Sequence, residues 1–224
     1  MTASNRPAAP PVDFMQTPPG LIIQLLMIAG VSFLLPPNLI WFPIGLTVAA
    51  WLLVLLSGEA WRDLGFFWPE VRPARWISEG IVTGLLLQFV VVGVLLPGLY
   101  ALFGQQPPVY GHAGDLAYLL SSILQYGILQ AIAKGLGHRA FVLHRLEKIF
   151  GASQPGLALT IVISAVLFGL ANWYVGLAGV VGAAAAGAVF NLLFYWSRRN
   201  IWPSILAHAV YNTALFALIY FGRI

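Results

Sequence analysis

Long apolar runs alternate with short polar or Pro/Gly-rich breaks over most of this chain. A helix that crosses the hydrocarbon core of a bilayer needs about 20 mostly apolar residues. The pattern therefore predicts an all-α protein, a polytopic transmembrane helix bundle with about seven spans. The runs lie at about 20–35, 39–57, 80–104, 116–144, 157–172, 176–196 and 201–221.

The chain divides into two parts by composition. Residues 1–19 are rich in proline and lack the basic-then-apolar order of a signal peptide, so they are expected to form a mobile cytoplasmic tail. Residues 20–224 are predicted to form one membrane-embedded domain. The first run of this domain is short and ends at Pro36-Pro37.

Composition and charge support a membrane protein. Hydrophobic residues make up 60% of the chain and charged residues only 8%. The net charge of +4 rests on eleven Lys and Arg that lie between apolar runs, so it indicates topology. We expect membrane lipids as neighbours and no nucleic-acid partner. The absence of cysteine excludes disulfides, thiol nucleophiles and Cys-ligated metals.

The positions of Arg and Lys predict an orientation. The loop 58–78, the turn at 145–148 and the Arg198-Arg199 pair carry these cations, whereas the loop around His112 has none. Because cytoplasmic loops are enriched in Lys and Arg, the N-terminus is predicted to be cytoplasmic. We expect an integral protein of a bacterial-type inner (cytoplasmic) membrane.

Small residues recur at four-residue spacing in the sixth run, at Gly179, Ala183 and Gly187. Such residues let helices approach closely, so this span is predicted to be central in the bundle.

Four polar residues stand inside predicted spans, where polar groups are costly and often functional: Lys134, Asn172, His208 and Asn212. Their distances from the helix ends allow all four to meet near the middle of the membrane. His208 and Asn212 are four residues apart and share one helix face. Gly135 and Arg139 are expected to share a face for the same reason. His138 is expected at the interface.

Three segments carry a resemblance to a known family. The third is His208-Ala209-Val210-Tyr211-Asn212, the second Phe168-Gly169-Leu170-Ala171-Asn172, and the first runs from Lys134-Gly135 to Arg139. In this order they resemble the motifs His-x-x-x-Asn, Phe-x-x-x-His and Glu-Glu-x-x-x-Arg of the CAAX-protease and bacteriocin-processing (CPBP, or Abi) intramembrane proteases. The resemblance extends over most of 60–215 and implies a CPBP-like fold.

In that family, the resemblance implies, the first glutamate activates a water, while histidines and the asparagine bind the water, a metal or the oxyanion. Here Lys134 and Gly135 replace both glutamates, and Asn172 replaces a histidine. An ammonium and an amide cannot act as the general base, and one histidine does not make a metal site. We therefore expect no competent catalytic residue, no metal and no cofactor. The vestigial site comprises Lys134, Gly135, Arg139, Asn172, His208 and Asn212.

The replacements also shift the charge of the site by three units toward positive. Burying Lys134 or Arg139 unpaired would cost several kcal/mol. We therefore expect a wet cavity, a neutral Lys134, a bound anion, or an acid from another helix such as Glu79 or Asp115.

Three functions remain open. The favoured one is a catalytically inactive homologue, not an enzyme, that binds a peptide, a lipidated tail or a membrane-protein partner. The first alternative is an active CPBP-type endopeptidase with an unrecognised residue set. The second is a small anion-binding or transport protein, although no inverted repeat is visible.

Overall fold

The computed structural model describes residues 14–35, 40–68 and 73–224. Within these ranges the regular structure is helical and includes no strand. Most of the predicted tail, residues 1–13, and Pro36-Pro37 lie outside the described residues. The rest of the predicted tail has regular structure, which was not expected: Phe14–Gln16 forms a 3-10 turn (η1), and α1 begins at Pro18.

Seven helical rods make up the described part of the chain, as the hydropathy pattern predicts. Five of them are single α-helices: α1 (Pro18–Leu34), α2 (Trp41–Leu56), α8 (Gln154–Leu170), α9 (Gly176–Trp196) and α10 (Trp202–Tyr220). A short 3-10 turn, η5 (Trp173–Val175), precedes α9.

The other two rods are composite, with π-helical segments between α-helical ones. The first consists of α3 (Pro73–Leu87), η2 (Gln88–Leu95) and α4 (Leu96–Phe103). The second consists of α5 (Leu116–Ser122), η3 (Ile123–Leu129), α6 (Gln130–Lys134), η4 (Gly135–Phe141) and α7 (Val142–Phe150). The second rod extends beyond its predicted end at 144, so Arg145, expected in a turn, lies within α7.

The rods have the length and composition of membrane helices. Four segments are long and apolar enough to cross a bilayer: Ala74–Phe103, Leu116–Phe150, Trp173–Trp196 and Trp202–Tyr220. The helices α1, α2 and α8 are apolar but shorter, at 17, 16 and 17 residues. The chain is therefore an integral membrane protein with about seven helical spans.

Local sequence explains where several helices begin. The Thr17 hydroxyl accepts a hydrogen bond from the Gly20 amide, and the Ser153 hydroxyl accepts one from the Gly156 amide. In both helices proline occupies the first turn, where its missing N–H is not needed. Asp115 caps α5 in the same manner.

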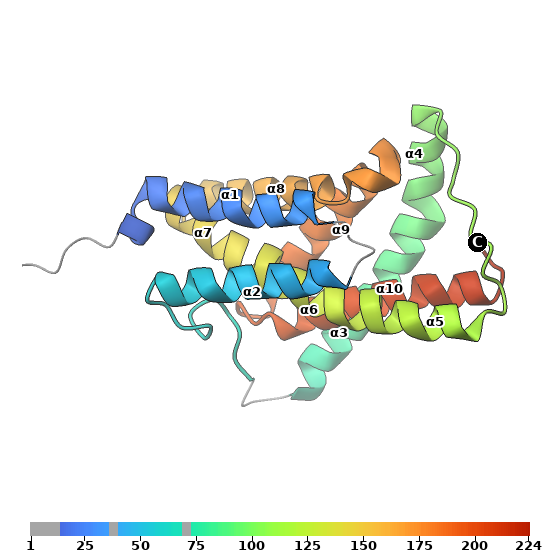
Figure 1. Cartoon of the computed structure of the whole chain (residues 1–224), viewed down its shortest axis with the longest axis horizontal. Coiled ribbons are helices and arrows are strands. Elements are labelled where there is room, and N and C mark those ends of the chain that lie inside the picture. The colour runs from blue at the N-terminus through green and yellow to red at the C-terminus, as the bar shows by residue number, and fades with distance from the viewer. Residues whose placement is uncertain (1–13, 36–39, 69–72) are drawn as a thin grey trace, which may run out of the picture.

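Helices distant in sequence pack side by side. The most extensive pairs are α10 with α3 and α8 with α9. In Figure 1 the rod from α3 to α4 runs steeply across the others, and the loop that follows α4 passes close to the C-terminus. The Gly114 amide donates to the Tyr220 carbonyl at 2.8 Å and fixes this loop to the end of α10.

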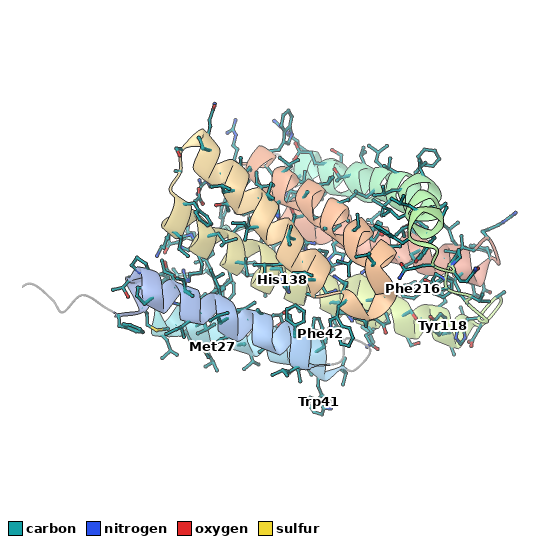
Figure 2. The ribbon with its side chains drawn as sticks, turned by 90° about the horizontal axis from the view of Figure 1, so that it is seen from above. Met27, Trp41, Phe42, Tyr118, His138 and Phe216 are labelled. Carbon is teal, nitrogen blue, oxygen red and sulfur yellow. The ribbon has the colours of Figure 1, made fainter. Side chains whose placement is uncertain are left out.

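Apolar side chains fill the interior and also cover the outside. Phe42, Leu46 and Phe141 are fully buried, whereas Leu26, Leu55 and other large apolar side chains on the outer faces are exposed. Figure 2 shows His138 within the bundle and Trp41 projecting from it. An apolar exterior is the surface that lipid chains contact.

The small residues of α9 do allow close packing, as predicted. A Cβ atom on Gly187 would lie 3.0 Å from Phe168 Cδ1, and one on Gly182 would lie 2.7 Å from Leu96 Cδ2. On the facing helix, Gly169 approaches Val180 O so closely that its Cβ would be 2.6 Å away. The helix α9 thus contacts α8, α4 and α10 at the centre of the bundle.

A polar cluster joins α7 to the residues after α2. Glu59 forms ion pairs with Arg145, Lys148 and His144, the last at 3.0 Å. Burial of the Glu59 carboxyl raises its pKa, but hydrogen bonds from His144 and Lys148 and the charge of Arg145 outweigh burial and lower the pKa to about 2. Arg145 also donates to Gln24 Oε1 at 2.8 Å. The cluster ties α7 to α1 and to the end of α2.

Candidate functional site

The site is built around the junction of α6 and η4. Lys134 ends α6, and Arg139 lies within the π-helical segment η4. A π-helix is hydrogen-bonded between residues five apart, so side chains at this spacing point the same way. Both cations accordingly face the Phe168 ring, with Lys134 Nζ at 5.4 Å and Arg139 Cζ at 5.3 Å from its centroid.

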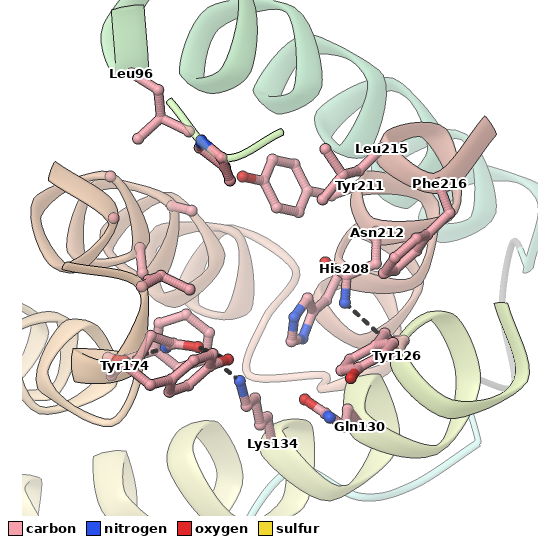
Figure 3. Close-up of a pocket in the computed structure, with 18 of the residues that line it drawn as sticks. Leu96, Tyr126, Gln130, Lys134, Tyr174, His208, Tyr211, Asn212, Leu215 and Phe216 are labelled. Carbon is pink, nitrogen blue, oxygen red and sulfur yellow. Dashed lines mark hydrogen bonds between the residues drawn. The ribbon is translucent and has the colours of Figure 1, made fainter. Parts of the chain in front are cut away.

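A cavity of about 580 Å³ opens beside this junction, and it collects the predicted residues. Lys134 comes from α6, Asn172 follows α8, and His208 and Asn212 lie on α10. Figure 3 shows Lys134, His208 and Asn212 around the cavity. The prediction that these four residues lie together is confirmed.

Asn172 is held by three hydrogen bonds. Its Oδ1 accepts from Lys134 Nζ at 3.0 Å and from the Tyr174 hydroxyl at 3.2 Å, and its Nδ2 donates to the Phe168 carbonyl at 2.7 Å. The amide is therefore fixed with its oxygen toward the lysine. Asn212 is held separately, with Nδ2 donating to the Tyr126 carbonyl at 2.7 Å.

Arg139 lies behind the cavity wall. Its Nη2 donates to His208 Nδ1 at 3.3 Å, and its guanidinium stacks 4.2 Å from the Phe190 ring centroid. Since a guanidinium only donates, Nδ1 accepts, and the imidazole carries its proton on Nε2. Arg139 is 1% exposed, and its Nε and Nη1 have no hydrogen-bond partner among the described residues.

Gly135 does not belong to the cavity, contrary to the predicted site. A Cβ atom there would lie 2.4 Å from Ile205 Cγ1, in the packing between the π-helical turn and α10. The expectation that Gly135 and Arg139 share a face is not met in their contacts, because Gly135 lies against Ile205 whereas Arg139 lies against the Phe168 and Phe190 rings.

No described carboxylate reaches the two cations, so neither Glu79 nor Asp115 supplies the acid that was one of the four possibilities. Glu79 binds Arg75 at 2.8 Å and accepts from the Ser197 hydroxyl, while Asp115 caps α5. The remaining described acids also have other partners: Glu59 in its cluster, Asp63 at the Ala60 amide and Glu147 at Arg199. In the described ranges there is also no group of three or more His, Cys, Asp or Glu that could hold a metal ion.

Tyrosine side chains are the main feature of the cavity that the motifs do not indicate. Six of the eight tyrosines in the chain line it: Tyr100, Tyr110, Tyr118, Tyr126, Tyr174 and Tyr211. The sequence did contain a signal, because Tyr118, Tyr126, Gln130 and Lys134 are separated by multiples of four. His138 also differs from expectation, since it is buried and lies 3.0 Å from the Ser32 hydroxyl.

One segment of the chain, which contains the predicted site residues, matches a known protein family. A family described as type II CAAX prenyl endopeptidase Rce1-like matches residues 116–214. This segment is similar to that family. It extends from the start of α5 into α10 and contains every residue of the predicted vestigial site, so the CPBP resemblance is confirmed there. The match does not include the portion of 60–215 before residue 116. No curated protein and no solved structure matches the chain.

Proposed function

We propose that the protein is a catalytically inactive relative of the Rce1-like peptidases that binds a peptide, a lipidated tail or a membrane partner without cleaving it. One observation carries the proposal. At the positions where the family motifs have a glutamate and a histidine, Lys134 and Asn172 are hydrogen-bonded to each other at the cavity wall.

Hydrolysis of a peptide bond requires a group that takes a proton from water. A charged lysine has no lone pair for this purpose, and the Asn172 amide is not a base. His208 has one basic nitrogen, but Nδ1 already accepts from Arg139. We therefore expect none of these three side chains to act as the general base.

The cavity itself supports retained binding. Its volume lies within the range of about 300–1,000 Å³ that is usual for ligand sites. The lining contains both aromatic rings and amide side chains, as do sites that hold an apolar body and orient it through a few polar contacts. A cavity of this size whose described lining includes no carboxylate supports a binding role.

A cleavage assay tests the proposal. The purified protein in lipid nanodiscs is incubated with isoprenylated and transmembrane peptides, and the products are analysed by mass spectrometry. We expect no cleavage, and His208→Ala should change stability or binding only. Arg62→Ala, at an exposed position of the loop after α2, is the control. Cleavage that disappears in His208→Ala and persists in Arg62→Ala would overturn the proposal.

We also propose a cytoplasmic N-terminus in a bacterial-type inner membrane. The support is the distribution of Arg and Lys, which gather in the 58–78 loop and after α9 and are absent from residues 104–115.

A further inference from the structure

We infer that the cavity binds a single-chain amphiphile with one carboxylate, which pairs with Lys134 while the hydrocarbon chain lies along α9. The inference rests on the proposed function, because it assigns the ligand class of the same non-hydrolytic site.

The first support is uncompensated charge. Lys134 and Arg139 are 4% and 1% exposed, and each described carboxylate has its partners elsewhere. Stacking on Phe168 and Phe190 offsets part of the cost of burying these cations. Buried charges in membrane proteins nevertheless normally face an opposite charge or a polar ligand. The missing charge is negative, so the ligand is an anion.

The second support is the set of donors at the cavity wall. An ammonium has three N–H donors, and the bond to Asn172 uses one. His208 adds Nε2–H, because its Nδ1 accepts from Arg139, and Figure 3 shows this ring in the cavity. Behind it, Arg139 keeps Nε and Nη1 unpartnered and adds positive potential. The Lys134 ammonium and the His208 Nε2–H are two donors, and a carboxylate has two oxygens to accept from them.

The third support is the number of charges. Lys134 is the one Lys or Arg among the described lining residues, so the wall offers a single formal charge at the surface of the cavity. A carboxylate matches the one cation that lines the cavity, because Arg139 lies behind the wall on His208, whereas a phosphate monoester carries nearly two charges at neutral pH. A compact head with one charge is therefore favoured.

The fourth support is the apolar part of the lining. Gly179, Gly182, Ala183 and Ala186 of α9 line the cavity with almost no side chain, and Leu96 and Leu215 add apolar surface. An extended hydrocarbon chain can lie against such a wall. The volume of about 580 Å³ fits one small-molecule ligand and not a two-chain phospholipid.

The loop after α4 forms part of the cavity wall. Gln105 Oε1 accepts from the Ala178 amide at 2.8 Å and so attaches this loop to the start of α9. Gln106, Pro108 and Tyr110 from the same loop line the cavity. The lining thus combines polar groups from this loop, the Lys134 ammonium and an apolar surface.

Binding of radiolabelled oleate to protein in phosphatidylcholine nanodiscs tests the inference. Oleyl alcohol, which has the same chain without the charge, and oleyl phosphate serve as competitors. We expect oleate to compete best and oleyl alcohol at least about tenfold less well, the value of one charge-assisted hydrogen bond. Equal competition by the alcohol would overturn the inference, and so would stronger competition by the phosphate.

Variants separate the charge from the cavity shape. Lys134→Met should weaken oleate binding about tenfold and leave oleyl alcohol unchanged, and Lys134→Arg should retain selectivity. Arg62→Met removes an exposed loop cation and should have no effect.

A second variant is informative if Lys134→Met does not fold. Ala183→Phe keeps the cation and fills the apolar wall, and it should weaken the binding of oleate but not of acetate. Unchanged oleate binding in folded Lys134→Met or Ala183→Phe would overturn the inference. Peptide cleavage with intact oleate selectivity would defeat only the proposed function.

Discussion

Gly135 provides a quantitative test of how α10 packs on the π-helical turn. An added Cβ would lie 2.4 Å from Cγ1 and 3.0 Å from Cδ1 of Ile205, whereas carbon atoms pack best at about 3.5–4.0 Å. Replacing a helix-interior glycine with alanine normally stabilises by about 1 kcal/mol, but overpacking costs about 1–3 kcal/mol. Gly135→Ala should therefore leave the free energy of unfolding unchanged or lower it by up to about 2 kcal/mol.

A double-mutant cycle isolates the contact. Ile205→Ala removes Cγ1 and Cδ1 and should cost about 2–5 kcal/mol by itself, because it leaves a cavity. In that background Gly135→Ala meets no clash and should be stabilising by about 1 kcal/mol. The two changes should therefore couple favourably by about 1–3 kcal/mol.

Unfolding of detergent-solubilised protein, followed by circular dichroism, measures these differences. Gly30→Ala in α1 is the control, because nothing lies within 4 Å of its added Cβ, and it should stabilise by about 1 kcal/mol. Equal effects of Gly135→Ala and Gly30→Ala, or additive effects in the cycle, would refute the packing argument. A glutamate at position 135 would meet the same obstacle and would need α10 to shift.

Three further predictions concern charge and topology. Because the folded-state pKa of Glu59 is about 2, below its ordinary 4.5, its contribution to stability is complete above pH 4.5. That contribution should be lost as pH falls toward 2, and Glu59→Gln should flatten this part of an acid-unfolding curve. The double variant Lys134→Glu/Asn172→His should be more thermostable than the parent and should gain a peptidase activity that neither single change gives. A double variant that folds but does not cleave peptides would mean that other catalytic features are missing. Single cysteines at Trp68 and Val109, which are exposed positions of loops on opposite sides of the predicted topology, should react with impermeant reagents from opposite faces; labelling of both from one face contradicts the orientation.

Hydropathy predicted the seven helical rods because a helix that crosses the bilayer needs an apolar run of a certain length. Motif spacing predicted that Lys134, Asn172 and His208 meet, since the helices that carry them are fixed by the same requirement. The orientation of Gly135 could not be predicted in this way. An i to i+5 register has no residue signature of its own and depends on packing, here against Ile205.

The sequence also did not predict which charged side chains pair with one another. Glu79 seemed able to reach a buried cation, but Arg75 lies one turn away on the same helix and takes the carboxylate. Arg145 looked like a topology marker, yet it is fully buried against Glu59 and Gln24. Such pairings depend on side-chain reach and depth, which hydropathy does not report.

The π-helical turn gives the spacing of the first motif a geometric meaning. Lys134 and Arg139 are five residues apart, the separation at which a π-helix places side chains on one face. Loss of one residue between them would leave a separation of four, at which an ordinary α-helix does the same. A single-residue deletion here could thus be absorbed by tightening one turn, with both cations still facing Phe168 and the rod beyond Phe141 keeping its register. Length variation in this segment would then be neutral for the site, whereas a two-residue deletion would rotate Arg139 away from it.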